Sequence, residues 1–190
     1  MGHKVLTVEP FYDNILRIHK ASQLAKLGDK ITLVQNALSN KRNEIKRLNP
    51  VNNNIGGQSL LDNKHKKFVS NPTDKYLVET IYFDDIVEYL PKDKNGTNYK
   101  NCILKIDIEG FEPFAFAQAT KLFNAVRINI IFMEWANLPK QVDETGLIEK
   151  MIKFLYENDL MPFDLSSKPL ERANWLKWPH DIIWKRVRRD

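Results

Sequence analysis

Two carboxylates stand at the end of a short apolar run near the middle of the chain. In the stretch N-C-I-L-K-I-D-I-E-G-F-E-P, Asp107 and Glu109 lie two residues apart. In a strand, this spacing directs both side chains to the same side. Gly110 then interrupts the extended pattern, and Pro113 suits the first turn of a helix. The pattern predicts a buried parallel strand over residues 103–108, followed by an acidic tip and a helix.

This acidic tip allows two interpretations. In open α/β sheets, ligands bind at the carboxyl ends of the strands, and carboxylates there are costly unless they meet a ligand, a metal or water. Asp107 and Glu109 could then accept a proton from a substrate, or bind magnesium through their oxygens. Alternatively, they only cap the helix that begins near Pro113 and otherwise face solvent. The local pattern leaves both interpretations open.

Composition indicates one globular domain over residues 1–190. Apolar residues make up 43% of the chain and charged residues 28%, which is typical of a folded domain. The net charge of +5 favours anionic ligands in general and does not indicate nucleic acid. The single Cys102 excludes an internal disulfide, and the scattered histidines predict no zinc site. No apolar run could span a bilayer and no signal peptide is evident, so we expect a cytoplasmic location by default.

Strands and helices alternate along the chain, which predicts a three-layer α/β domain. The predicted strands cover residues 4–8, 31–34, 76–83, 103–108 and 127–133. Two of them end in acids, Glu9 and Glu134, in the same way that the central strand ends in Asp107. Segments 160–165 and 181–186 should form an antiparallel ribbon. Residues 41–67 are basic but have no interleaved aromatic residues, so we expect a solvated loop rather than a nucleic-acid interface.

Several motifs occur in a recognisable order. They are V-L-T-V-E-P-F at Val5–Phe11, Q-N-A-L-S at Gln35–Ser39, T-I-Y-F-D-D-I-V at Thr80–Val87, L-K-I-D-I-E-G-F-E at Leu104–Glu112 and I-I-F-M-E at Ile130–Glu134. Together they resemble the FkbM-type S-adenosylmethionine-dependent methyltransferases over nearly the whole chain. The resemblance implies a Rossmann-like class I methyltransferase sheet, mostly parallel, with an antiparallel ribbon at the C-terminus.

The resemblance also implies roles for particular residues. Glu9 would bind the ribose of S-adenosylmethionine, because one carboxylate can accept hydrogen bonds from both hydroxyls of a diol. Asn36 and Ala37 would lie near the adenine, although the Asn36 amide could instead only close a turn. Asp107 would lie near the methionine end of the cofactor and the acceptor. The candidates for a general base are Asp107, Glu109 and Glu134, and no metal is implied.

The chain departs from the family pattern at its start. Members begin with a strand and a glycine-rich loop similar to D-x-G-x-N-x-G, which cradles the methionine end of the cofactor. We therefore expect a truncated domain without the central first strand, and weak or absent binding of S-adenosylmethionine. The expected acceptor is a hydroxyl on a small molecule, a sugar or a lipid. The alternatives are a catalytically inactive remnant or interaction module of the same fold and, third, a magnesium-dependent phosphoryl enzyme.

Overall fold

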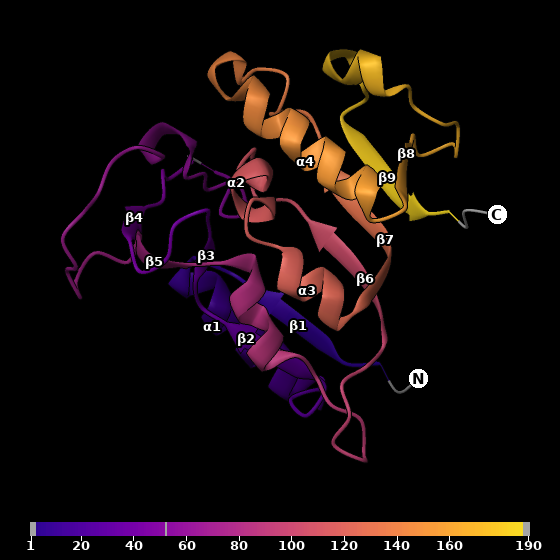
Figure 1. Ribbon diagram of the computed structural model, residues 1–190. Helices are drawn as coiled ribbons and strands as arrows, with labels where there is room; N and C mark the ends of the chain where they lie inside the picture. Colours follow the sequence, from indigo (N-terminus) through magenta and orange to yellow (C-terminus); the bar gives the residue numbers. More distant parts are fainter. Residues whose placement is uncertain (1–2, 52, 188–190) are drawn as a thin grey trace.

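The strands within the described part of the chain form three sheets (Figure 1). A computed structural model describes residues 3–51 and 53–187. The first sheet pairs β1 (Val5–Val8) with β2 (Ile31–Val34) in parallel. The second contains β3 (Ala37–Leu38) and β5 (Leu77–Ile81) in parallel and β4 (Ile45–Arg47) antiparallel to β5. The third has the order β6 (Asn101–Ile106), β7 (Arg127–Glu134), β9 (Asp181–Arg186), β8 (Leu160–Phe163).

The third sheet is mixed. Strands β6 and β7 are parallel, whereas β9 is antiparallel to both β7 and β8, which confirms the predicted C-terminal ribbon. One continuous, mostly parallel sheet is not confirmed, because no hydrogen-bonded ladder within the described residues joins β1 to β6. Leu6 and Val8 of β1 nevertheless pack against the main core, so the first and third sheets share apolar contacts. The fold is thus a mixed α/β arrangement of several sheets.

The helices α2 (Glu112–Phe116), α3 (Thr120–Ala125) and α4 (Thr145–Glu157) lie on one face of the third sheet, and α1 (Tyr12–Leu24) contacts β2 (Figure 1). Short 3-10 helices are η1 (Leu61–Asn63), η2 (Phe83–Tyr89), η3 (Val142–Glu144) and η4 (Arg172–Lys177). Helix α4 buries Ile148, Met151, Ile152 and Leu155, the predicted apolar stripe. None of the helices among the described residues is both long and apolar enough to cross a membrane.

The prediction that the central strand is buried on both faces is wrong. Strand β6 turns Leu104 and Ile106 towards the core, while Ile103 on the other face is 64% exposed. The physical reason is that β6 is an edge strand of its sheet and that α2, α3 and α4 cover only one face. An apolar run indicates high β-propensity, but it does not reveal which face has a covering layer.

A second apolar core connects the strand ends to the loops that surround them. It contains Phe11, Ala37, Leu48, Leu60, Val78, Phe111 and Phe114. The rings of Phe111 and Phe114 stack with their centroids 4.3 Å apart, and those of Phe11 and Tyr76 stack at 5.3 Å. Such offset aromatic pairs add specific geometry to the burial of apolar area. This core fixes the start of α2 against the ends of β1 and β2.

Candidate functional site

The carboxyl ends of three strands meet at a cavity of about 90 Å³. Glu9 follows β1, Asn36 follows β2, Ala37 begins β3, and Asp107 and Glu109 follow β6; all five residues line the cavity. The structure therefore brings together five of the six residues singled out in the sequence. The sixth, Glu134 at the end of β7, lies beside Asp107 and Glu109 rather than in the wall of the cavity.

A loop that the sequence analysis treated as merely solvated completes the cavity. Gly56, Gln58 and Leu60 line its wall. The neighbouring Gly57 is buried, and a Cβ atom there would lie 3.3 Å from Oε1 of Glu109. The adjacent glycines Gly56 and Gly57 could have indicated this close approach, since a backbone that passes near another side chain favours glycine. The basic composition of residues 41–67 instead favoured the interpretation of a solvated loop.

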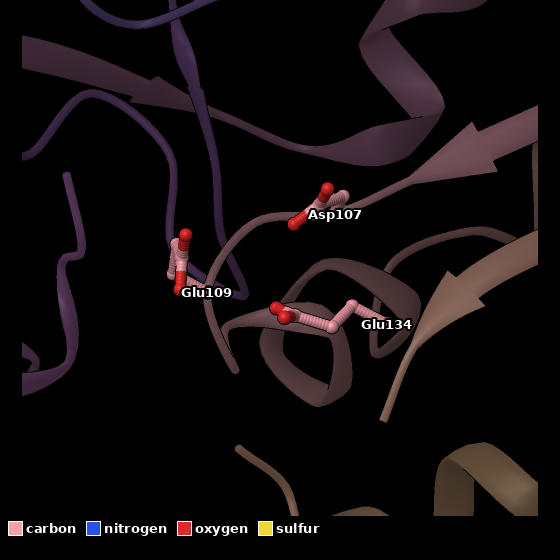
Figure 2. A group of neighbouring side chains, drawn as sticks. All are labelled: Asp107, Glu109 and Glu134. Atoms are coloured by element: carbon pink, nitrogen blue, oxygen red, sulfur yellow. The ribbon is translucent and has the colours of Figure 1, made fainter. Parts of the chain in front are cut away.

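Asp107, Glu109 and Glu134 form an acidic cluster (Figure 2). One carboxylate oxygen of each lies within 4.8 Å of those of the other two, and the three side chains extend towards a shared space. The expectation that strand geometry directs Asp107 and Glu109 to the same side is wrong. Strand β6 ends at Ile106, and Glu109 has a left-handed backbone with φ of 56°. A turn, rather than the alternation of a strand, brings the carboxylates together.

Two polar side chains bind to this cluster. The Nζ atom of Lys105 donates to Oδ2 of Asp107 at 2.8 Å. The amide nitrogen of Asn137 donates to Oε2 of Glu109 at 3.1 Å and lies 3.5 Å from Oε2 of Glu134. These contacts offset part of the repulsion among the three negative charges. Asn137 was not singled out in the sequence, although it follows Glu134 at a strand end.

The cluster is electrostatically suited to accept a proton. Burial raises the pKa of Glu134, and the nearby charges of Asp107 and Glu109 raise it further. His180 partly counteracts these effects; its Nε2 atom lies 3.5 Å from Oε1 of Glu134. A carboxylate whose pKa lies closer to neutrality is a better general base than an ordinary one.

The contact with His180 depends on strand pairing. The register of β7 and β9 sets Glu134 opposite Asp181, so His180 reaches the acidic cluster from the far end of the chain. Its Nδ1 atom lies 3.3 Å from Oδ2 of Asp181. The histidines share no ligand spacing in the sequence, so the sequence alone predicts no role for His180. No local signal could have paired His180 with Glu134, since they are 46 positions apart in the sequence.

The alternative that Asp107 and Glu109 only cap the following helix is not what the structure shows. Phe111 occupies the position before α2, and no side-chain hydrogen bond caps that end of the helix. Asp107 bonds to Lys105 instead, and Glu109 bonds to Asn137. Both carboxylates therefore face the cavity and the acidic cluster.

Glu9 and Asn36 are held at the cavity by backbone contacts. Oε1 of Glu9 accepts a hydrogen bond from the backbone N–H of Phe11 at 2.8 Å, which orients the carboxylate. The amide nitrogen of Asn36 donates to the backbone oxygen of Glu79 at 3.2 Å. This bond ties the end of β2 to β5 rather than closing a local turn. Both side chains are thus positioned before any ligand arrives.

Glu112 is a fully buried carboxylate beneath the acidic turn, with an exposed fraction of 0%. Its Oε1 atom accepts a hydrogen bond from the backbone N–H of Ile108 at 2.9 Å. Burial raises the pKa of Glu112 to about 7, and the charges of Glu134 and Asp107 add to the effect. The motif containing Glu112 was recognised in the sequence, but no role was assigned to this residue.

The same turn requires glycine at position 110. Gly110 has φ of 88°, and a Cβ atom there would lie 2.8 Å from Nε2 of Gln141 and 2.9 Å from Cδ1 of Leu61. We expect Gly110→Ala to lower the free energy of unfolding by about 1–3 kcal/mol, the usual cost of a strained backbone position. Urea denaturation at equilibrium would measure it.

The matched control is Gly146→Ala in α4. A Cβ atom at Gly146 meets nothing within 4 Å. Because alanine favours a helix over glycine, this substitution should leave stability unchanged or raise it by up to about 1 kcal/mol. Equal stability of Gly110→Ala and the wild type would contradict the requirement for glycine in the acidic turn.

Comparison with known proteins assigns this chain to a family. The model of the methyltransferase FkbM domain matches residues 1–160 of the 190. A crystal structure of methyltransferase FkbM from Methylobacillus flagellatus KT is similar, with a TM-score of 0.47 and 14% sequence identity. The match covers 96% of this chain but only 36% of that one. The comparison with curated proteins finds no match. Because the family model spans most of the sequence, this chain belongs to the FkbM methyltransferase domain family.

Proposed function

We propose that the cavity at the strand ends binds S-adenosylmethionine and that the chain transfers its methyl group to a hydroxyl. The observation that carries this proposal is the meeting of Glu9, Asn36 and Asp107, from three separate strands, at one cavity. Family membership supports it, because FkbM domains are methyltransferases. We further propose that the separate sheets correspond to parts of a single Rossmann-like domain.

The residues present fit the parts of this cofactor. The Glu9 carboxylate, with one oxygen already oriented by Phe11, would accept hydrogen bonds from the ribose hydroxyls. Asn36 and Ala37 would border the adenine. Asp107, a member of the acidic cluster, would lie near the positively charged methionine end. The negative charge of Asp107 would attract this positive charge, with the modest strength expected of an exposed group.

The size of the cavity bears on how much of the cofactor it holds. A volume of about 90 Å³ lies below the roughly 300–1,000 Å³ typical of small-molecule sites. The cavity would therefore enclose only part of S-adenosylmethionine, and the rest would extend over the acidic cluster. Modest affinity is expected, which agrees with the weak binding anticipated from the sequence.

Methyl transfer needs an aligned acceptor and a place for its proton. Bound S-adenosylmethionine would supply the methyl group, whose carbon is electrophilic because it is attached to a positively charged sulfonium sulfur. As the acceptor oxygen bonded to the methyl carbon, the bond from that carbon to sulfur would break with its electron pair on sulfur, which would leave S-adenosylhomocysteine. The hydroxyl proton would pass to a carboxylate of Asp107, Glu109 or Glu134. The acceptor would be a small molecule, a sugar or a lipid that carries the hydroxyl.

Isothermal titration calorimetry with S-adenosylmethionine tests the binding site. The wild-type chain should show saturable binding with one site, and Glu9→Gln should weaken it by about tenfold or more, since a lost charged hydrogen bond costs roughly 1.5–3 kcal/mol. Glu149→Gln, an exposed position on α4, is the matched control and should bind as the wild type does. No detectable heat with the wild type would favour the inactive remnant or interaction module.

A divalent cation is a second candidate ligand, favoured by the three converging carboxylate oxygens. Such oxygens are the ligands that magnesium prefers. Thermal denaturation with and without magnesium would test this candidate. Stabilisation that Glu134→Gln abolishes, together with cleavage of a phosphoester, would support the magnesium-dependent phosphoryl enzyme instead of the methyltransferase.

A further inference from the structure

Glu112 has a feature that packing alone does not explain. Its side chain is completely buried, and among the described residues its Oε2 atom has no hydrogen-bond partner. A buried polar atom without a partner costs stability, whereas an apolar side chain of similar volume would not. A leucine would therefore fill the same space more favourably, so the carboxylate calls for a reason other than stability.

The hydrogen bond that Glu112 accepts from the backbone N–H of Ile108 points to that reason. Strand β6 ends at Ile106, so the backbone N–H of Ile108 lies beyond the ladder that pairs β6 with β7. Oε1 of Glu112 accepts from this N–H at 2.9 Å. Ile108 lies between Asp107 and Glu109, and all three line the cavity. The bond therefore fixes the backbone at the point from which both carboxylates extend.

Other side chains secure the rest of the same turn. Nε2 of Gln141 donates to the backbone oxygen of Gly110 at 2.7 Å, and Oγ of Ser59 donates to that of Glu109 at 3.3 Å. The positive φ of Glu109, 56°, is costly for a residue other than glycine and persists only if the surroundings impose it, whereas Gly110 adopts its φ of 88° without that cost. Of these anchors, Glu112 alone is fully buried.

We propose that Glu112 is a positioning residue: its hydrogen bond to the Ile108 amide holds Asp107 and Glu109 in the orientation that the site uses. Glu112 itself touches no ligand. The expected effect on S-adenosylmethionine binding rests on the proposed function. The effect on the backbone of the turn does not, and it can be measured separately. Such an arrangement sacrifices stability for a precise backbone geometry at the site.

Two variants separate positioning from simple packing. Glu112→Gln keeps an oxygen that can accept from the Ile108 N–H, whereas Glu112→Leu keeps the volume and removes the acceptor. Hydrogen exchange of the Ile108 amide, followed by NMR in the full chain, should be about tenfold or more faster in Glu112→Leu, the factor for a bond worth about 1.4 kcal/mol. Glu112→Gln should restore most of the protection. The melting temperature of Glu112→Leu should stay close to that of the wild type, because the removal of a buried carboxylate offsets the loss of the acceptor for the Ile108 N–H.

S-adenosylmethionine binding, measured by calorimetry, is the second readout. It should weaken about tenfold in Glu112→Leu although the fold is no less stable, because the geometry of Asp107 and Glu109 is lost. If Glu112 only filled space in the core, its substitution would change the melting temperature and the affinity in parallel. Unchanged exchange at Ile108 in Glu112→Leu, or binding that merely follows the melting temperature, would overturn the proposal. If the wild type does not bind S-adenosylmethionine, the proposed function fails, while the exchange rates still decide whether Glu112 holds the turn.

Discussion

Asp107→Asn should lower kcat for methyl transfer by about 10²–10⁴-fold, the usual contribution of a general base. The substitution preserves size and shape but removes the negative charge and the capacity to accept a proton. KM for S-adenosylmethionine should rise far less than kcat falls, because the proposed binding of the ribose rests on Glu9 and Asp107 would meet only the methionine end. Glu9→Gln should show the opposite pattern, raising KM more than it lowers kcat. The measurement is steady-state formation of S-adenosylhomocysteine with a panel of sugar, lipid and small-molecule hydroxyl acceptors.

Thermal melts of both variants provide the control. Asp107 is partly exposed and bonds to the exposed Lys105, a surface ion pair of a kind worth about 0–1 kcal/mol. Both variants should therefore melt close to the wild type. Full activity of Asp107→Asn would end its assignment as the base and leave Glu109 and Glu134 as the candidates. A loss of activity that accompanies unfolding would show a structural effect instead.

The second large effect concerns the dependence of stability on pH. The pKa of Glu112 is about 7 in the folded chain, against an ordinary value of 4.5. Between these values the folded state keeps a proton that the unfolded state has released. The contribution of Glu112 to stability is therefore greatest below pH 4.5 and declines as the pH rises to about 7. The total decline is about 3 kcal/mol, at about 1.4 kcal/mol per pH unit.

Glu112→Gln isolates this contribution because glutamine does not titrate. The difference in the free energy of unfolding, variant minus wild type, should increase by about 3 kcal/mol between pH 4.5 and pH 8. Urea denaturation at several pH values measures it. Titration of Glu134, whose pKa is also raised, occurs in both proteins and largely cancels in the difference. Parallel pH curves for the two proteins would contradict the buried, proton-retaining state of Glu112.

The local elements of the site could be predicted because their signals are local. Glu9, Asn36 and Asp107 each follow a short β-rich run, and the structure places each at the end of a strand. The stripe of α4 was equally clear, since Ile148 and Ile152 recur at helical spacing. The sequence therefore predicts those site residues whose positions depend on one strand and the turn that follows it.

The contacts that depend on tertiary structure could not be predicted in this way. His180 reaches Glu134 only through the register of β9 on β7, and Gln58 reaches the cavity only through the path of a long loop. The outer face of β6 was misjudged because Ile103 is as apolar as its buried neighbours, although no layer covers it. Sequence patterns report what a segment prefers; they do not report what lies against it.

The most direct test of the central claim is to map where S-adenosylmethionine binds. The amide signals of the full chain would be followed by NMR while the cofactor is added. We expect saturable shifts at Glu9, Asn36, Ala37 and Asp107, with no change at Arg172, which borders a separate hollow near α4. Binding of S-adenosylmethionine at the cavity would be contradicted by shifts confined to that hollow. It would also be contradicted by the absence of shifts at several millimolar cofactor, since a Kd of about 1 mM already corresponds to a binding free energy of only roughly −4 kcal/mol.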